Sequence, residues 1–165
     1  MGNRRFMKGG WVRPSDLPRG PTGRALCRFC HKNECLPPRR TFCSEWCVHE
    51  FKIRTRGSYA KKELYKRDKG VCRFCQTDTK LIARDLLEIR IELGRGEEDR
   101  FKRLHGIPAS RTVWRRKLGG GLWDMDHVVA VRDGGGECGL AGLQTLCIPC
   151  HRERTAKQRR DRITE

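Results

Sequence analysis

The cysteine residues constrain the fold of this chain more than any other feature of its sequence. Eight of the ten cysteines form close pairs, three of the C-x2-C type and one of the C-x3-C type. The pairs are Cys27/Cys30, Cys43/Cys47, Cys72/Cys75 and Cys147/Cys150. Two residues between thiols let one tight turn aim both sulfurs at a single tetrahedral ion, and two such turns complete a closed site. The spacing therefore predicts two structural Zn²⁺ sites.

The order of the pairs along the chain suggests how they combine. Twelve residues separate the first two pairs, which is an ordinary spacing in zinc modules, whereas 71 residues separate the last two. His31 and His49 are alternative ligands of the first site. Cys35 and Cys138 are left over, and we expect a small buried side chain or an idle thiol at each. A disulfide scaffold is the competing interpretation of all ten cysteines.

The charge balance points to a polyanionic partner. The chain has 37 Lys and Arg residues against 20 Asp and Glu residues, a formal charge of +17. Two zinc ions bound by eight thiolates would lower this charge by four, to +13. No apolar run approaches the length of a membrane span, and the first residues lack the apolar core of a secretory signal. We expect a soluble intracellular protein without membrane contact, cytoplasmic in a bacterium or nuclear in a eukaryote.

The first half of the chain divides into an arm, a zinc module and the start of a larger domain. Residues 1–24 have no hydrophobic period and predict a flexible basic arm, and residues 25–57 carry the first two cysteine pairs. Within this module, Ser44 is a suitable N-cap for a helix that continues to Ile53. Residues 58–68 predict a second helix.

Residues 58–165 predict the larger domain, with a helical insertion at about 79–118. Asp78 or Thr79 caps a helix in this insertion, whose apolar stripe contains Ile82, Leu86, Ile89 and Leu93. Residues 122–131 and 143–146 predict two strands joined by a glycine-rich turn, and residues 149–162 predict a basic helix. The sequence therefore predicts a small α+β protein in which zinc holds two strands and a helix together.

Three polar residues near these elements could carry chemistry. Asp126 and His127 lie on the first predicted strand, and His151 follows Cys150 at the start of the final helix. Strand alternation places Asp126 and His127 on opposite faces unless a twist or bulge brings them together. A carboxylate and an imidazole can bind one divalent cation with open positions for water and phosphate, and a second imidazole can act as a general base.

This arrangement resembles the HNH family of endonucleases. The resemblance lies in Cys72-x2-Cys75, Asp126-His127, the glycine-rich turn, and the run from Leu143 to His151, and in its wider form it covers roughly residues 25–160. It implies a ββα-metal core in which Asp126 and His151 bind a catalytic Mg²⁺ or Mn²⁺ ion and His127 activates water. It also implies that the last two cysteine pairs bind structural zinc. Gly142 stands where the family usually has Asn, which lowers the expected rigidity of the turn or the rate.

The predicted function is metal-dependent hydrolysis of DNA phosphodiester bonds, by one metal ion, with weak sequence preference and with structure-specific cleavage left open. Duplex or branched DNA is the expected partner, and DNA repair the expected setting. Nine basic residues are expected to contact backbone phosphates: Lys61, Lys62, Lys66, Arg67, Arg152, Arg154, Lys157, Arg159 and Arg160. Two alternatives stay open: a non-catalytic zinc module that binds nucleic acid or protein, and the detached nuclease part of a larger repair enzyme. The sequence carries no signal for an oligomeric state.

Overall fold

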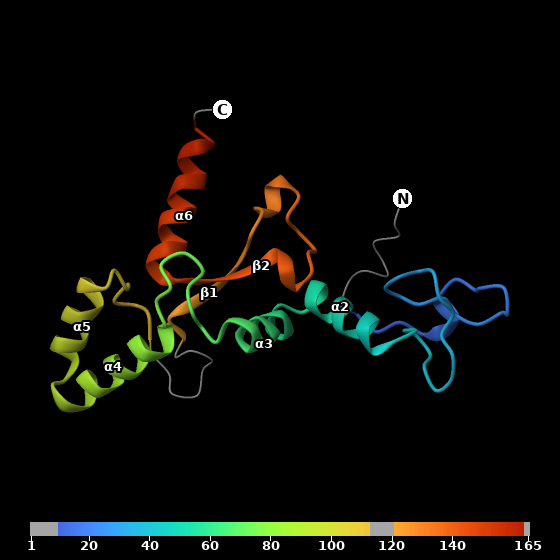
Figure 1. The fold of residues 1–165 in the computed structure, drawn as a ribbon, viewed down its shortest axis with the longest axis horizontal. Coiled ribbons are helices and arrows are strands. Elements are labelled where there is room, and N and C mark those ends of the chain that lie inside the picture. Colours follow the sequence, from blue (N-terminus) through green and yellow to red (C-terminus); the bar gives the residue numbers. More distant parts are fainter. Residues whose placement is uncertain (1–9, 113–120, 164–165) are drawn as a thin grey trace. The chain divides into compact units, whose positions relative to one another are not determined.

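The computed structural model describes residues 10–112 and 121–163. Its helices and strands, in chain order, are α2 (Glu45–Thr55), α3 (Gly57–Asp68), α4 (Thr79–Glu92), α5 (Arg95–Leu104), β1 (Trp123–His127), β2 (Leu143–Cys147) and α6 (Ile148–Asp161) (Figure 1). The strands pair as one antiparallel sheet, and α6 follows β2 directly. The predicted α+β class, with a ββα core, is confirmed.

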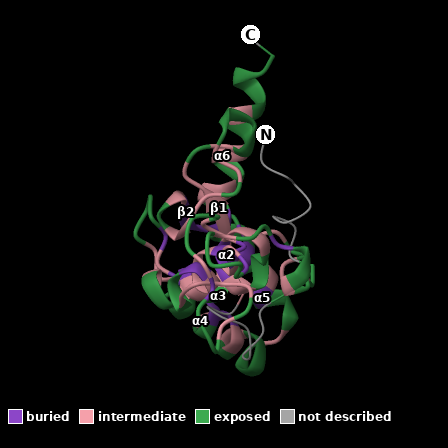
Figure 2. Cartoon of the chain, turned by 90° about the vertical axis from the view of Figure 1, so that its right-hand side faces the viewer, coloured by how far each residue is buried: buried purple, intermediate pink, exposed green. Residues whose placement is uncertain are grey.

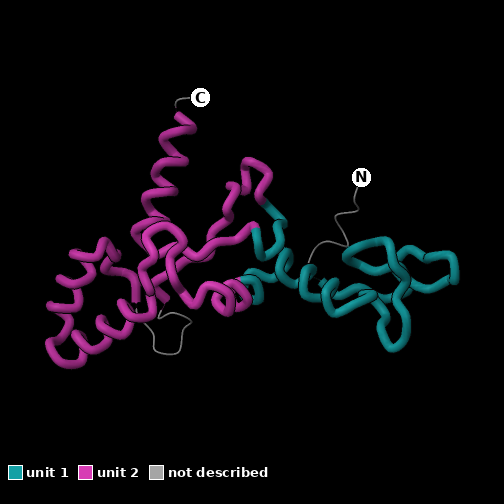
Figure 3. The backbone as a smooth tube through the Cα atoms, viewed as in Figure 1, with its two compact units in different colours: residues 1–60, 136–141 teal, residues 61–135, 142–165 magenta. Residues whose placement is uncertain are grey.

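The chain forms two compact units (Figure 3). Unit 1 contains residues 1–60 and 136–141, and unit 2 contains residues 61–135 and 142–165. The boundary falls within α3, and the short segment 136–141 joins the first cysteine module rather than the hairpin that surrounds it in the sequence. Each unit carries one set of paired cysteines.

Unit 1 is built around its cysteine turns and the short helix α2. The Ser44 hydroxyl accepts a hydrogen bond from the backbone N–H of Cys47 at 3.1 Å, which caps α2 as predicted. Phe51 and Ile53 on this helix are buried. Leu17, within the segment predicted as a flexible arm, is only 3% exposed and so belongs to the core. Residues 1–9 of that predicted arm lie outside the described residues.

The hairpin of unit 2 positions the candidate site. β1 and β2 pair without interruption from Trp123 opposite Cys147 to His127 opposite Leu143. All five residues of β2 are buried, so this strand lies in the interior. The predicted first strand was too long at its C-terminal end, because Ala130 accepts hydrogen bonds from the backbone N–H groups of residues 133 and 135 and curls the chain into a turn.

Residues at the end of α3 form hydrogen bonds with strand β2. The Arg67 guanidinium donates to both carboxylate oxygens of Asp68 and to the carbonyl of Leu143. Asp68 in turn accepts from the hydroxyl of the buried Thr145 at 2.8 Å. Hydrogen bonds to ionised groups are the stronger kind, so these contacts fix both the start and the middle of β2 against α3.

The insertion in unit 2 is a pair of helices. Asp78 caps α4 as predicted, by accepting from the backbone N–H of Lys80 at 2.8 Å. The predicted apolar stripe is only partly correct: Leu86 is 1% exposed and Ile82 packs on the same cluster, whereas Leu93 is 65% exposed. Residues 113–118 of the predicted insertion lie outside the described residues.

Helix α5 lies within the predicted helical insertion, although its own bounds were not predicted. It is held by the buried ion pair between Lys102 and Glu98, at 2.6 Å, which Arg90 of α4 approaches at 3.6 Å. Pairing of this kind satisfies buried charges that would otherwise be costly. Within residues 10–112 and 121–163, none of the helices combines the length and apolar character needed to cross a bilayer.

Candidate functional site

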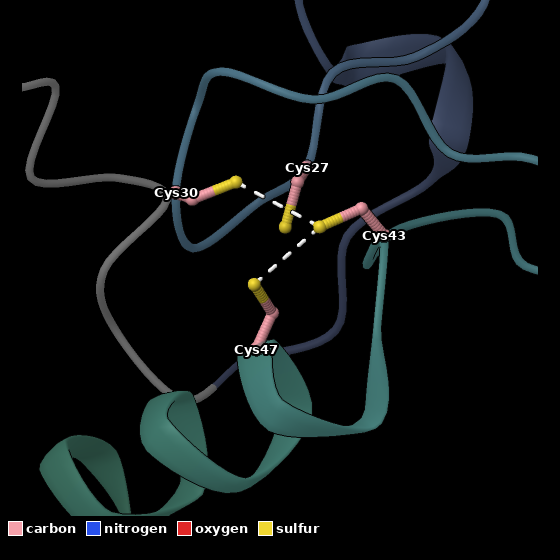
Figure 4. Close-up of side chains that lie close together, drawn as sticks. All are labelled: Cys27, Cys30, Cys43 and Cys47. Carbon is pink, nitrogen blue, oxygen red and sulfur yellow. Dashed lines mark hydrogen bonds between the residues drawn. The ribbon is translucent and has the colours of Figure 1, made fainter.

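The first cysteine tetrad lies in unit 1 (Figure 4). Cys27 and Cys30 come from one turn, Cys43 from the loop before α2, and Cys47 from the first turn of α2. Their sulfurs all lie within 4.8 Å of one another. The turn is closed by a hydrogen bond from the backbone N–H of His31 to the carbonyl of Cys27, with His31 in the left-handed region at φ 55°. Four sulfurs at this spacing could hold a structural Zn²⁺ ion.

The second tetrad lies in unit 2 and joins residues that are distant in the sequence. Cys72 and Cys75 form a turn of the same kind, in which Gln76 repeats the left-handed conformation at φ 59° and donates to the carbonyl of Cys72. Cys147 ends β2 and Cys150 lies in the first turn of α6. These four sulfurs also lie within 4.8 Å of one another. The predicted pairing of both tetrads is confirmed, and each could hold zinc.

The thiol pKa values differ within each tetrad. Burial disfavours the thiolate and raises the pKa of Cys47 to about 12 and that of Cys150 to about 11. Burial acts in the same direction at Cys30, but hydrogen bonds from neighbouring backbone N–H groups and thiols lower the pKa of Cys30 to about 7. At Cys75, burial is outweighed by hydrogen bonds from the side chain and backbone of Thr77, which lower its pKa to about 6. One thiol in each tetrad is therefore readily ionised near neutral pH.

The residues considered as alternative ligands lie outside the tetrads. His49 Nδ1 is 2.9 Å from the hydroxyl of Tyr59, and His31 is exposed at its turn. Cys35 is buried beside the first tetrad, where burial raises its pKa to about 11. Cys138 is half-buried and belongs to neither tetrad.

Asp126 and His127 end strand β1. Asp126 accepts from the backbone N–H of His127 at 2.8 Å through Oδ1 and from Arg154 Nη1 at 2.7 Å through Oδ2. Arg154 Nη2 also donates to the carbonyl of Val128 at 2.7 Å. Pairing is regular through His127, so no bulge brings the two side chains to one face. In the part of the chain that the structure describes, no group hydrogen-bonds to the His127 ring.

His151 binds a different aspartate from the one we expected. Its Nδ1 lies 2.9 Å from Oδ2 of Asp124, two residues before Asp126. Arg111 Nη2 donates to both carboxylate oxygens of Asp124, each at 2.7 Å. Asp124 was not predicted as a site residue, although residues two apart on a strand share a face. Arg111 lies in the predicted insertion and had no local signal at all.

A face of β1 and a face of α6 thus meet through paired charges. Two carboxylates, of Asp124 and Asp126, pair with two guanidinium groups, of Arg111 and Arg154. The formal charges of these four groups therefore sum to zero, apart from any charge on His151. Carboxylate oxygen and imidazole nitrogen are donors that suit Mg²⁺ or Mn²⁺. A divalent cation would add two positive charges to this balanced site, and a phosphate ligand would offset part of that excess. The donor types therefore fit a cation bound together with phosphate.

The structure does not gather the predicted catalytic residues into a third ligand cluster. Among the described residues, three or more His, Cys, Asp or Glu ligand atoms come within 4.8 Å of one another only in the two cysteine tetrads. One oxygen of Asp126 is taken by Arg154, which a cation would have to share or displace. The assignment of Asp126, His127 and His151 stays a prediction.

Gly142 lies at the turn before β2. Its carbonyl accepts from the backbone N–H of Val128 at 2.8 Å, and the side chain of Gln144 donates to the carbonyl of His127 at 3.2 Å. The end of β1 is therefore held by backbone atoms of residue 142 and by the neighbouring glutamine. These contacts brace the turn at Gly142, where the sequence predicted a loss of rigidity.

The basic residues expected to contact DNA have different surroundings. Seven of them are exposed: Lys62, Lys66, Arg67, Arg152, Lys157, Arg159 and Arg160. Figure 2 shows that α6 is largely exposed beyond its first turns. Lys66 pairs with Glu63, and Lys61 Nζ lies 4.6 Å from the centroid of the Trp123 ring. Arg67 and Arg154 carry the hydrogen bonds described above. Contact of these residues with DNA stays a prediction.

Comparison with known proteins places the chain beside ZRANB3. It is 31% identical to the mouse protein named DNA annealing helicase and endonuclease ZRANB3 and 30% identical to the human one. Each match covers 85% of this chain and 14% of the relative, so the chain spans about one seventh of their length.

The crystal structure of the human ZRANB3 HNH domain matches 65% of this chain and 92% of that one, with 29% identity and a TM-score of 0.39. No family model matches the chain. The chain is a homologue of a segment of ZRANB3, whose name describes an endonuclease, in agreement with the similarity to endonucleases that the sequence predicts.

Proposed function

We propose that this chain is a metal-dependent HNH endonuclease that hydrolyses phosphodiester bonds in DNA with weak sequence preference. One observation carries the proposal: Asp126 and His127 end β1 and His151 lies in the first turn of α6, on a ββα frame closed by a cysteine tetrad. The relatives are named as endonucleases, which supports the same activity here.

The candidate residues would divide the work as follows. Asp126 and His151 would hold a Mg²⁺ or Mn²⁺ ion, which when bound stabilises negative charge on phosphate oxygens. The neutral ring of His127 would accept a proton from water as the water oxygen attacks phosphorus. The bond from phosphorus to the 3′ oxygen would break, and the leaving oxygen would take a proton from solvent water, which gives a 3′-hydroxyl and a 5′-phosphate. A His127 ring without a hydrogen-bond partner among the described residues is suited to bind that water.

The DNA backbone would lie along α6. A groove of about 360 Å³ lies beside this helix. It is lined by three arginines, Arg132, Arg159 and Arg162, together with Thr155 and Gln158. Contacts to phosphate position DNA without reading its sequence. This distribution supports weak sequence preference and leaves duplex and branched substrates as the DNA structures to test.

Cleavage of supercoiled plasmid by the zinc-loaded chain tests the proposal. Mg²⁺ or Mn²⁺ should be added to desalted protein rather than removed with a chelator, because a chelator would also strip structural zinc. We expect nicking that requires the added cation and that falls about 100-fold or more in Asp126→Asn. Asp85→Asn, an exposed carboxylate on α4, is the matched control and should cut like the wild type. Absence of cutting on duplex, branched and single-stranded DNA alike would overturn the proposal.

A non-catalytic nucleic-acid-binding module is the second candidate. The hydrogen bond from Arg154 to Asp126 favours it, because that oxygen is one that a catalytic cation would use. This candidate predicts salt-sensitive DNA binding without turnover in the wild type, and binding that survives Asp126→Ala.

A further inference from the structure

We propose that Asp124 is a positioning residue that selects which ring nitrogen of His151 faces the catalytic cation, and that Arg111 holds Asp124 in place. This inference rests on the proposed function, in which His151 holds that cation. It gives the helical insertion a role in the site, since Arg111 comes from the chain that follows α5.

The hydrogen bond between His151 and Asp124 defines the ring. Asp124 Oδ2 lies 2.9 Å from Nδ1 of His151. An ionised carboxylate only accepts hydrogen bonds, so Nδ1 carries the hydrogen and the lone pair of the neutral ring lies on Nε2. Histidines that bind metals usually donate their other ring N–H to a carboxylate or carbonyl, which fixes the tautomer and the orientation of the ring. The contact present here is of that kind.

Arg111 holds the carboxylate of Asp124, which in turn orients the ring of His151. One guanidinium nitrogen donates to both oxygens of Asp124 at 2.7 Å, so the carboxylate is held from the side of the insertion while His151 holds it from α6. Arg111 is itself placed by a turn in which its backbone N–H donates to the carbonyl of Pro108 at 2.9 Å. Ile107, at the start of this segment, is buried against Leu86 of α4. The packing of the insertion therefore fixes the position of Arg111, and through Asp124 the orientation of the His151 ring.

The two aspartates of β1 have separate partners. Asp124 is engaged by His151 and Arg111, whereas Asp126 is engaged by Arg154 and by the backbone at residue 127. Asp124 accepts one hydrogen bond at Oδ1 and two at Oδ2, whereas Asp126 accepts one at each oxygen, so Asp126 has more capacity left for a cation. This separation assigns positioning to Asp124 and leaves Asp126 as the cation ligand.

The tautomer of His151 tests the inference without any activity measurement. We would record ring ¹⁵N chemical shifts by NMR on the full zinc-loaded chain without Mg²⁺ or Mn²⁺, at about pH 8, above the usual range in which imidazole titrates. The expected result is a ring protonated at Nδ1 in the wild type, with that preference lost in Asp124→Ala and weakened in Arg111→Ala. Asp85→Ala and Arg84→Ala, exposed partners on α4, are matched controls and should leave the ring unchanged.

Cation binding gives an independent measurement. Loss of a residue that orients a metal ligand typically weakens metal binding or activity by about 10-fold to 100-fold. We expect the Kd for Mn²⁺ to rise by that factor in Asp124→Ala, and to recover partly in Asp124→Glu, which keeps the carboxylate. Arg111→Ala serves if Asp124→Ala fails to fold.

A wild-type ring protonated at Nε2, or a ring unchanged by both substitutions, would overturn the inference. A wild-type chain with the Nδ1–H ring that cleaves no DNA would instead overturn the proposed nuclease activity, so the two failures can be told apart.

Discussion

The sulfurs of Cys75 and Cys147 lie 3.6 Å apart, although 72 positions separate the two residues along the chain. The insertion, the hairpin turn and both strands lie between them in sequence. A tetrad of this kind can form only when the turn at Cys72 and the end of β2 fold together, so zinc binding here contributes directly to folding.

The first prediction concerns this tetrad. Cys147→Ser should remove one of two bound zinc ions and abolish the cooperative thermal unfolding of unit 2, because the binding energy of a structural zinc is as large as the net stability of an ordinary domain. Cys138→Ser, which changes a thiol outside both tetrads, should keep both ions. Zinc content per chain and thermal melting followed by circular dichroism check this. A Cys147→Ser protein with wild-type melting would show that the tetrad does not stabilise the fold.

The second prediction concerns pH. Burial raises the pKa of Cys47 to about 12 and of Cys150 to about 11, so in metal-free protein both thiols are protonated at neutral pH and must each release a proton to bind zinc. Protons therefore compete with zinc, and retention of zinc should fall as pH is lowered from about 8 to about 5. Transfer of zinc to a colorimetric chelator at several pH values measures this. Retention that improves on acidification would contradict the assignment of these thiols as ligands.

The third prediction concerns the turn after β1. A Cβ atom on Gly135 would lie 1.9 Å from the backbone carbonyl oxygen of Val129, so Gly135→Ala must shift the turn and should lower the free energy of unfolding by about 1 to 3 kcal/mol. Gly96→Ala is the control, because a Cβ there meets nothing within 4 Å inside helix α5. It should raise stability by about 0.5 to 1 kcal/mol. Urea unfolding measures the free energy of unfolding of both variants. Equal values for Gly135→Ala and Gly96→Ala would mean that the turn relaxes without cost.

The fourth prediction concerns DNA binding. Arg159 is exposed on α6 and lines the groove that it shares with Arg132 and Arg162. If it contacts a phosphate, Arg159→Ala should weaken binding to unrelated sequences alike and reduce the slope of log K against log salt by about 1. Arg84→Ala, on the exposed side of α4, should leave the slope unchanged. Fluorescence anisotropy across a salt series measures both, and an unaltered slope in Arg159→Ala would remove this residue from the interface.

Local rules explain which elements were predictable from the sequence. Ser44 and Asp78 cap their helices as expected, because capping depends on a side chain and the next few backbone groups. Each cysteine pair followed from turn spacing for the same reason, whereas the second tetrad joins pairs that are separated by 71 residues. The bounds of helix α5 within the predicted insertion were not recognised, because only Phe101 and Leu104 of its residues are large and apolar and because the helix is held by the buried pair of Glu98 and Lys102, a contact that no hydrophobic pattern reveals.

The candidate site was predictable only in part, for a physical reason. The sequence identified Asp126, His127 and His151 but expected a regular strand through residue 131, whereas backbone hydrogen bonds to Ala130 end the extended structure at His127. The bond between His151 and Asp124 depends on the register of β1 against β2 and on where α6 begins. Tertiary packing sets both, so spacing along the chain could not identify the partner.

A single-turnover nicking assay tests most directly whether His127 takes a proton during DNA hydrolysis. His127→Asn should bind DNA with the wild-type Kd while its nicking rate with saturating Mg²⁺ falls by about 100-fold to 10,000-fold, the usual contribution of a general base. His105→Asn, an exposed histidine at the end of α5, should nick at the wild-type rate. Equal nicking rates for His127→Asn and the wild type would show that His127 is not the general base.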